Sequence, residues 1–465
     1  MTDNAATANA ALSYRERDIA SVLHPQTNAL KHLSVGPTII TGSNGVFVTD
    51  DTGKQYLDSG AGLWCASLGY HNERLAKVAY KAMSELGYFQ IFRHASHKAA
   101  IDLSERLLEI APVEMSKVLL QCSGSEANDT GVKIVWYYWN ALGKPERRKI
   151  ITRMGSYHGS TCVATSMTGN GAYHRSFGLP FSEFLHTDLP NHYRNALPGE
   201  TEQEFSSRLA DSLERMILAE GPETIAAFWA DPVQGNAGAL PPPAGYFEKV
   251  QAVLKKYGIL FVADEVICGF GRTGEMWGCQ TYDLKPDMIA CAKGLSSGMQ
   301  PISALLINDK IFEVLRDESN RLGAFVHGFT YAGHPVATAV ALETLKIYEE
   351  MDIVAQVQSV EGTFLQNLDD LSSHPLVGAT SGCGLIGGLE LVMNKESKAP
   401  FPAEANLIGT IDKYAQQFGI ILRVVPNRIA YSPSLIIDEA GLDEMARRTR
   451  QVLDATLNEL KRFVR

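Results

Sequence analysis

The fold is organised around the stretch Ala290-Cys291-Ala292-Lys293-Gly294-Leu295-Ser296-Ser297-Gly298. An apolar run, Met288 to Ala292, ends at Lys293, and a turn rich in glycine and serine follows. This pattern is typical of a buried strand that delivers an amine to the edge of a sheet. Such a lysine is either a structural residue in an ion pair or an amine whose pKa has been lowered so that it attacks carbonyls. This stretch alone favours the structural alternative, so the other strand ends must decide.

The segment from residue 117 to residue 307 alternates apolar runs with amphipathic ones. The predicted strands are 117–121, 148–152, 225–230, 259–263, 288–292 and 302–307, and the predicted helices between them are 124–142, 206–219 and 245–257. Continuous apolar strands separated by amphipathic helices predict a parallel or mostly parallel sheet with helices on both faces. Ligands of such sheets bind beyond the carboxyl ends of the strands, which is where the polar residues fall here.

The flanking segments complete the predicted secondary structure. Before the alternation we expect a flexible or partner-draped arm over the first twenty or so residues, a β-meander at 38–57, a glycine-rich irregular stretch at 60–65, and helices at 73–86 and 97–110. After it we expect a long helix at 337–351, one glycine-spaced strand at 382–390, a hairpin formed by 419–425 and 428–431, and an amphipathic helix at 442–460.

Composition excludes several classes of protein. With 465 residues, 45% of them hydrophobic, the chain has room for two or three domains and is not disordered. A net charge of -10 without long basic runs disfavours a nucleic-acid partner. No secretory signal or membrane-spanning run is present, so we expect a cytoplasmic protein without a membrane partner. Its seven scattered cysteines indicate neither a disulfide framework nor a zinc site, and we expect no metal.

Besides the strand that ends at Lys293, three other strand ends carry polar residues that could belong to a site. Residues 123–125 (Ser-Gly-Ser) place backbone N–H groups and hydroxyls at a helix N-terminus, which is a weak signal for a phosphate site. Tyr157 and His158 offer ring faces for stacking, or are packed loop residues. Asp264 ends an apolar strand, where a carboxylate must find a cation or strong donors, for example as a helix cap or in an ion pair with Arg272.

Taken together, these groups are the complement of one kind of ligand. A phosphate site, an aromatic face, a buried carboxylate and a nucleophilic lysine suit an aromatic aldehyde that bears a phosphate and a basic ring nitrogen. Lys293 would form a Schiff base with the aldehyde. Asp264 would hold the proton on the ring nitrogen, so that the ring can accept electrons from a carbanion.

Seven motifs also resemble a known family, the class III pyridoxal-phosphate-dependent aminotransferases, along nearly the whole chain. They are Gly62–Cys65, Ser123–Asn128, Tyr157–Gly159, Asp231–Gly235, Ala263–Gly274, Ala292–Gly298 and Gly328–Pro335. The resemblance implies an α/β protein of fold type I, with a mostly parallel seven-stranded sheet in a large domain. A smaller α+β domain would be formed by the N- and C-terminal segments. The implied boundaries are 1–70 for the arm and small-domain segment, 71–335 for the large domain, and 336–465 for the C-terminal small domain.

The resemblance implies pyridoxal 5'-phosphate as the cofactor, with Lys293 as its Schiff-base partner and as the base of the 1,3-proton shift. Asp264 would pair with the pyridine nitrogen, Tyr157 would stack on the ring, and Val266 would pack on the other face. The implied cofactor-binding set is Ser123, Gly124, Ser125, Tyr157, His158, Asp231, Asp264, Val266, Lys293, Phe329 and Thr330. The last two would reach the phosphate in the neighbouring subunit, so the resemblance implies a homodimer with shared active sites and leaves a tetramer open.

Two departures from the family pattern bear on the site. Asp231 stands where the family usually carries glutamate, and the shorter side chain leaves its hydrogen bonds near the cofactor open. Asn236 stands where ornithine and 4-aminobutyrate members carry a glutamate that masks a carboxylate-binding arginine. Members with a small or neutral residue there use pyruvate as the acceptor and amines or ω-amino acids as donors, and this chain resembles them more closely.

The resemblance also implies a substrate site. Arg423 would swing in to bind an α-carboxylate and out for an apolar amine, although the local sequence equally fits a surface strand arginine. Trp64, Phe92 and Tyr157 would form an apolar pocket that tolerates many amines. The predicted reaction is a ping-pong transfer from putrescine, β-alanine, arylalkylamines or similar donors to pyruvate or a related oxo-acid. The alternatives are a 2-oxoglutarate-dependent ω-amino acid transaminase, an aminomutase or decarboxylase, and a non-catalytic binding protein, which Lys293 and Asp264 disfavour.

Overall fold

A seven-stranded sheet forms the centre of the computed structural model, which describes residues 12–464. Its strands are β4 (Lys117–Gln121), β5 (Lys149–Arg153), β6 (Phe184–Thr187), β7 (Ile225–Ala230), β8 (Leu260–Asp264), β9 (Met288–Cys291) and β10 (Ser303–Ile307). They lie in the order β4-β10-β9-β8-β7-β5-β6, and β10 alone runs against its neighbours. The predicted mostly parallel sheet of seven strands is therefore confirmed. Of the seven, β6 was not predicted, because its four residues include a histidine and a threonine and form no apolar run.

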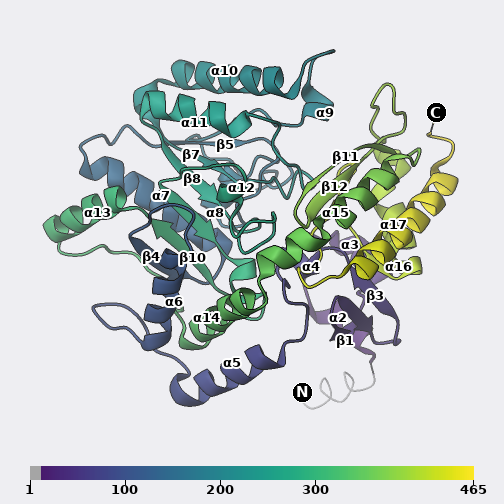
Figure 1. Ribbon diagram of the computed structural model, residues 1–465, viewed down its shortest axis with the longest axis horizontal. Coiled ribbons are helices and arrows are strands. Elements are labelled where there is room, and N and C mark those ends of the chain that lie inside the picture. Colours follow the sequence, from purple (N-terminus) through teal and green to yellow (C-terminus); the bar gives the residue numbers. More distant parts are fainter. Residues whose placement is uncertain (1–11, 465) are drawn as a thin grey trace, which may run out of the picture.

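Helices cover both faces of this sheet (Figure 1). On one face, α7 (Gly124–Ala141) and α13 (Asp309–Leu322) share an apolar cluster with Trp229 and Val262. On the other face, α10 (Glu202–Glu220) and α11 (Tyr246–Tyr257) pack with Phe228 and Phe261. Neighbouring residues of one strand point to opposite faces, so a strand covered on both sides must be apolar throughout, as β7 and β8 are.

Two smaller four-stranded sheets lie beside the large one (Figure 1). The first contains the predicted meander, β1 (Ile40–Asn44), β2 (Phe47–Asp50) and β3 (Gln55–Asp58), and β13 (Ile420–Ile421) joins it parallel to β3. The second has the order β11 (Val377–Cys383), β12 (Ile386–Leu391), β15 (Arg428–Tyr431), β14 (Arg423–Val425), in which β14 and β15 form the predicted hairpin. Segments from both ends of the chain thus meet in one sheet.

The prediction of a single strand at 382–390 was wrong. The chain turns back at Gly384, so β11 and β12 form an antiparallel pair instead. Gly384 has a φ of 52°, and a Cβ there would lie 2.4 Å from the carbonyl carbon of Thr273. Only glycine fits this close approach, and in the sequence it looked like one more glycine of a regular strand.

Among the remaining helices, those predicted at 73–86, 97–110, 337–351 and 442–460 are present, and the others were not predicted. The remaining helices are α2 (Tyr14–Ser21), α3 (Ala29–Val35), α4 (Ala61–Trp64), α5 (Glu73–Leu86), α6 (Lys98–Glu109), α8 (Cys162–Met167), α9 (His192–Asn195), α12 (Gly278–Thr281), α14 (Pro335–Glu350), α15 (Ile353–Ser372), α16 (Leu407–Phe418) and α17 (Glu439–Leu460). Part of the expected N-terminal arm, residues 1–11, lies outside the described residues, but residues 14–21 form a helix capped by Ser13 and Glu16. The expected irregular stretch at 60–65 contains the short α4, which is broken by non-helical backbone at Gly62. None of the described helices is long and apolar enough to cross a bilayer.

Candidate active site

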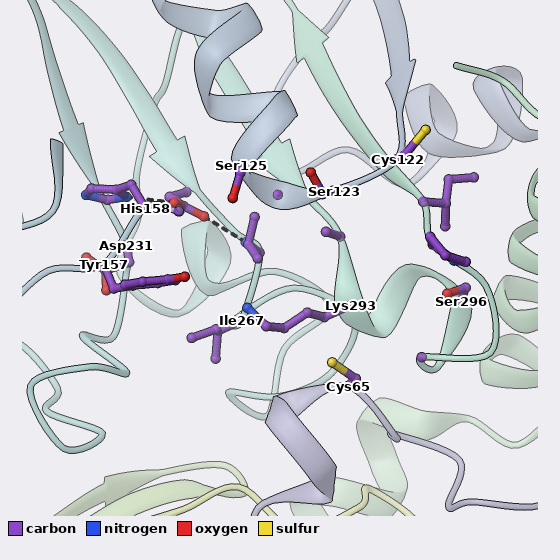
Figure 2. A pocket seen from close by; sticks show the side chains of 18 of the residues that line it. Cys65, Cys122, Ser123, Ser125, Tyr157, His158, Asp231, Ile267, Lys293 and Ser296 are labelled. Atoms are coloured by element: carbon purple, nitrogen blue, oxygen red, sulfur yellow. Dashed lines mark hydrogen bonds and ion pairs between the residues drawn. The ribbon is translucent and has the colours of Figure 1, made fainter. Parts of the chain in front are cut away.

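A cavity of about 350 Å³ lies beyond the carboxyl ends of the parallel strands. The predicted residues that line it are Ser123, Gly124, Ser125, Tyr157, His158, Asp231, Asp264, Val266 and Lys293. Figure 2 shows Lys293 reaching toward its centre, with the two serines of the α7 end on one side and Cys65 on the opposite side. The structure therefore brings together the four strand ends that the sequence singled out.

The N-terminus of α7 faces this cavity with unpaired donors. Ser123 caps the helix, because its hydroxyl accepts a hydrogen bond from the backbone N–H of Glu126 at 3.2 Å. The Glu126 carboxylate accepts from the N–H of Cys122 at 2.7 Å, one residue before the cap. Within residues 12–464, no acceptor binds the N–H groups of Gly124 and Ser125. Two free donors at the positive end of a long helix suit a phosphate group.

Close packing around this helix end requires glycine at two positions. A Cβ at Gly124 would lie 3.0 Å from Cγ1 of Val266, and one at Gly159 would lie 2.5 Å from Oγ of Ser125. The Ser125 hydroxyl accepts from the N–H of Ser160 at 3.0 Å, so its own proton stays free to be donated. The glycines thus keep open a narrow space that the backbone donors and one hydroxyl line.

Asp264 is buried and held by three donors. Its Oδ2 lies 2.7 Å from Nδ1 of His158 and accepts from Nδ2 of Asn128 at 2.9 Å, while Oδ1 accepts from the N–H of Val266 at 3.1 Å. Asn128 is fixed in turn by Nε1 of Trp229, which donates to its side-chain oxygen at 3.1 Å. Donors on both oxygens hold the carboxylate in one orientation, in which it can accept a hydrogen bond from a protonated ring nitrogen.

The structural alternative for Asp264, an ion pair with Arg272, is not formed. The guanidinium of Arg272 is buried and donates to the carbonyls of Leu385 and Pro433, at 2.9 and 2.6 Å. Arg272 therefore links the loop after β8 to the smaller sheets, and it leaves Asp264 to face the cavity.

Lys293 follows β9 in a strained conformation, with a φ of 46°. Such strain in a residue other than glycine is common at active sites. Burial lowers the pKa of Lys293 below its usual 10.5, and the positive charge of Arg423 acts in the same direction. No acceptor in the described part of the chain binds its Nζ. An amine with a lowered pKa and no ion-pair partner has the properties of a nucleophile rather than of a structural lysine.

Asp231 forms a buried ion pair, which explains the first departure from the family pattern. Its Oδ1 accepts from the guanidinium of Arg153 at 2.8 Å, and the same nitrogen also contacts the Asp231 carbonyl. The Arg153 guanidinium lies 5.7 Å from the ring of Tyr246 and 5.3 Å from that of Phe247. Asp231 therefore fixes the wall of the cavity. No pattern in the sequence indicated Arg153, which looks there like an ordinary arginine at the end of a strand.

A second cavity, of about 700 Å³, contains Arg423, Asn236 and Tyr173. The Arg423 guanidinium lies 5.9 Å from the ring of Trp64, and its buried Nε has no partner. In residues 12–464 no carboxylate forms an ion pair with it, so Arg423 is a cavity residue rather than a surface arginine. The rings of Tyr157 and Tyr173 are 5.4 Å apart, which places the two cavities side by side.

Four predicted residues line neither cavity; one of them, Trp64, lies beside Arg423, and the other three are farther along the chain. Phe92 packs against Gly328, where a Cβ would lie 2.7 Å from its ring, and it does not join Trp64 in one wall. Phe329 and Thr330 follow in the same segment and line neither cavity. The resemblance assigns Phe329 and Thr330 to the neighbouring subunit's site, which agrees with their position apart from this one.

Several lining residues were not predicted, among them Cys65, Cys122, Ile267, Ser296 and Gln300. Cys65 and Ile267 stand in motifs that the sequence did single out, next to Trp64 and Val266. Their position next to a predicted site residue was the one feature of the sequence that could have identified Cys65 and Ile267 as lining residues. Residues 300–302 stand in none of these motifs, so the sequence offered no signal for them.

These features fit pyridoxal 5'-phosphate. The free N–H groups of α7 and the Ser125 hydroxyl would hold its phosphate, Asp264 its ring nitrogen, and Lys293 its aldehyde. Val266, which packs against Gly124, gives the cavity an apolar side chain on which a flat ring could lie. Asp264 is buried, Gly124, Ser125 and Lys293 are half-buried, and all four line the cavity.

Comparisons with known proteins point the same way. The family model described as aminotransferase class-III matches residues 28–453. Gamma aminobutyrate transaminase 3, chloroplastic, of Solanum lycopersicum is 48% identical over 95% of this chain and 85% of its own length. The omega transaminase of Pseudomonas jessenii in complex with PMP superposes with a TM-score of 0.95 and 49% identity, covering 97% of this chain and 99% of that one. A transaminase solved with L-alanine gives a TM-score of 0.88 and 47% identity over 91% of this chain and 99% of that one.

Proposed function

The chain belongs to the class III aminotransferases, which use pyridoxal 5'-phosphate, and we propose that it transfers the amino group of amines and ω-amino acids to pyruvate. The bound cofactor supplies an electron-accepting ring and carries the amino group from the donor to the acceptor. Amino-group transfer follows from the family. The choice of donor and acceptor is the proposal, and it rests on the residues around Arg423.

The protein's own groups have distinct tasks in this reaction. Lys293 gives and takes protons at Nζ, and its lowered pKa leaves more of it neutral at neutral pH. Asp264 keeps a proton on the ring nitrogen, supported by His158 and Asn128. The α7 N-terminus anchors the phosphate and so fixes the distance between Lys293 and the reacting carbon.

The unpaired guanidinium of Arg423 is the observation that supports a monocarboxylate acceptor. Arg423 is the one guanidinium among the described residues that line the two cavities, because Arg153 is paired with Asp231 outside them. A dicarboxylate such as 2-oxoglutarate would need a second cation, whereas pyruvate needs one. Asn236 is neutral and does not compete for Arg423, so nothing has to be displaced before the acceptor binds.

Donor choice is supported by the apolar walls and by the relatives. Trp64 and Tyr157 offer aromatic surface near Arg423, which suits arylalkylamines, while Arg423 itself suits the carboxylate of β-alanine or 4-aminobutyrate. A relative that is 48% identical is named for 4-aminobutyrate. We therefore expect a broad donor range in which ω-amino acids and apolar amines, including putrescine, are both accepted.

The positions of Phe92, Phe329 and Thr330 support a homodimer with shared active sites. None of the three lines the cavity around Lys293 or the cavity around Arg423 in its own chain. The family pattern nevertheless places Phe329 and Thr330 at a cofactor phosphate. Light scattering tests the dimer, and mixing tests the sharing. A Lys293→Ala chain and a Thr330→Ala chain, each impaired alone, should regain activity as a mixed dimer, since one of its two sites is then complete. Activity in a monomeric fraction would contradict this arrangement.

The acceptor is tested by half-reactions. Enzyme loaded with its amine-form cofactor is mixed with pyruvate or with 2-oxoglutarate, and the return of the aldehyde absorbance is followed. We expect kcat/KM to be at least about 10-fold higher for pyruvate, and Arg423→Gln to lower it by a similar factor without changing the half-reaction with 1-phenylethylamine. A preference for 2-oxoglutarate would overturn the acceptor assignment, and carbon dioxide release without alanine would indicate a decarboxylase.

A further inference from the structure

Three potential metal ligands converge near the start of the described chain, far from the cofactor site in sequence. Nε2 of His24 lies 2.8 Å from Oδ1 of Asp18, and Nε2 of His32 lies 3.2 Å from the same oxygen. The two imidazole rings have centroids 4.3 Å apart. In residues 12–464 this is the one group of three such side chains whose ligand atoms all lie within 4.8 Å of one another.

The spacing of these atoms matches the edges of a metal coordination polyhedron. In a tetrahedral zinc site with ligand distances near 2.0–2.1 Å, neighbouring ligand atoms are about 3.3 Å apart. The two distances to Asp18 lie close to that value, so an ion could enter with side-chain movements of a few tenths of an ångström on those edges. Two imidazoles and one carboxylate form a donor set that suits zinc and related divalent transition metals rather than calcium or magnesium.

We propose that Asp18, His24 and His32 bind one divalent transition metal ion of the zinc class. The ligand side chains are 18%, 30% and 11% exposed, so the site is sheltered but reachable from solvent. Three protein ligands leave a fourth position for water. The cysteines indicated no zinc site, and these three residues were not identified in the sequence because their spacing, six and eight residues apart, follows no common zinc motif.

The helices around the site explain why a metal would be useful there. α2 has eight residues and α3 has seven, and neither contains a buried residue. Helices this short are marginal in water, and most helices gain their stability from an apolar face that these two lack. A metal bound by Asp18 from α2, His32 from α3 and His24 from the connecting loop would join the two helices at one point and stabilise the whole segment.

The connecting loop also reaches the substrate side of the enzyme. Gln26 lies between His24 and His32 in the chain and lines the cavity that contains Arg423. Its side-chain oxygen accepts from the Tyr173 hydroxyl at 3.4 Å. A metal ion that fixes His24 and His32 would therefore fix the loop that carries Gln26 against this cavity. The metal site itself does not depend on which amine or oxo-acid the enzyme uses.

The test uses the full-length holoenzyme after chelator treatment and dialysis. Zn²⁺ binding is measured by equilibrium dialysis with elemental analysis, for the wild type and for Asp18→Asn, His24→Gln and His32→Gln. We expect one zinc ion per chain in the wild type and an affinity at least about 10-fold weaker in each variant. His71→Gln and Cys162→Ser, which change an exposed histidine and an exposed free cysteine elsewhere, are the controls and should bind zinc like the wild type.

Trypsin cleavage provides a second measurement that does not depend on activity. Arg17 and Lys31 are exposed, and each directly precedes a proposed ligand in the chain, Asp18 and His32. Zinc should slow cleavage at both in the wild type and leave the His32→Gln variant unaffected, while the cofactor absorbance reports that this variant is folded. Failure of the wild type to retain zinc would overturn the proposal. So would a zinc affinity equal to that of the wild type in all three ligand variants, because the contacts with Asp18 would then be hydrogen bonds only.

Discussion

Oδ2 of Asp264 lies 2.7 Å from Nδ1 of His158, and both side chains are buried. Nε2 of His158 has no partner among the described residues. Within residues 12–464, His158 and Asn128 bond only to Oδ2, and Oδ1 accepts from the N–H of Val266 alone, so His158 orients the carboxylate and leaves Oδ1 a lone pair for a donor in the cavity. Support by a second residue is how a buried carboxylate keeps its orientation during proton transfer.

Asp264→Asn should remove the charge that keeps a proton on the cofactor ring. We expect the half-reaction with an amine to slow by about 100-fold or more, because this charge acts directly on the reacting system. Cofactor absorbance should still appear, since Lys293 and the α7 end are intact. His158→Gln should slow the same half-reaction by only about 10-fold, because it changes the support and keeps the carboxylate. Stopped-flow spectra give both rates, and equal losses in the two variants would contradict this order.

Lys293 should make cofactor uptake depend on pH in a defined direction. The neutral amine captures an aldehyde, and the fraction of neutral amine rises with pH and reaches one half at the pKa. Since burial lowers the pKa of Lys293, the uptake rate of the apoenzyme should rise with pH with a midpoint below 10.5. Mixing apoenzyme with pyridoxal 5'-phosphate at a series of pH values measures this. Lys293→Ala should take up no cofactor covalently, and a wild-type midpoint at or above pH 10.5 would refute the lowered pKa.

The sequence could predict the strands and the chemistry at their ends because both depend on local residue types. Ile225–Ala230 and Met288–Cys291 are apolar runs with no helical period, and Asp264 and Lys293 each stand at the end of such a run. Parallel strands place their carboxyl ends together, so the convergence of these residues followed from the alternation alone.

Other features depend on contacts between distant segments, and no local pattern could indicate them. Arg153 pairs with Asp231 across 78 positions, and Gly384 is required because Thr273 lies against it. Phe92 illustrates a further limit, since the resemblance placed it in one wall with Trp64, whereas the structure places it against Gly328 at another cavity. The family resemblance supplied its assignment, and a single sequence gives no means of telling on which chain's site such a residue acts.

Glu265 should make stability decrease as the pH rises. It is fully buried, accepts from the N–H groups of Gly278 and Cys279, and burial raises its pKa from 4.5 to about 7. Between these values the folded protein holds a proton that the unfolded chain has released, so up to about 3 kcal/mol of stability is present at pH 4.5 and is lost as the pH passes 7. Glu265→Gln should lower Tm at every pH, and its Tm should change less with pH than that of the wild type. Thermal unfolding of both holoenzymes from pH 5 to pH 8 checks it, and parallel curves would contradict it.

Gly131→Ala should disturb both the fold and the site. A Cβ at Gly131, inside α7, would lie 2.4 Å from the ring of Trp229, whose Nε1 holds Asn128 against Asp264. We expect a loss of about 1–3 kcal/mol in unfolding free energy and a slower amine half-reaction. Gly362→Ala is the matched control, because Gly362 lies inside α15 with no atom within 4 Å of its Cβ position. It should gain about 0.5–1 kcal/mol and keep full activity.

Asn236→Asp should convert the open guanidinium of Arg423 into a paired one. Both residues line the second cavity, and Nδ2 of Asn236 is buried without a partner. A carboxylate at position 236 would attract Arg423 and compete with the substrate carboxylate, so we expect the KM for pyruvate to rise about 10-fold, which is about 1.4 kcal/mol of binding. The half-reaction with 1-phenylethylamine, which has no carboxylate, should change by less than about 3-fold. Asn236→Leu has a similar size and no charge, so its pyruvate KM should stay near the wild-type value. Equal effects of the two substitutions would show that shape at this position, and not the freedom of Arg423, controls the acceptor.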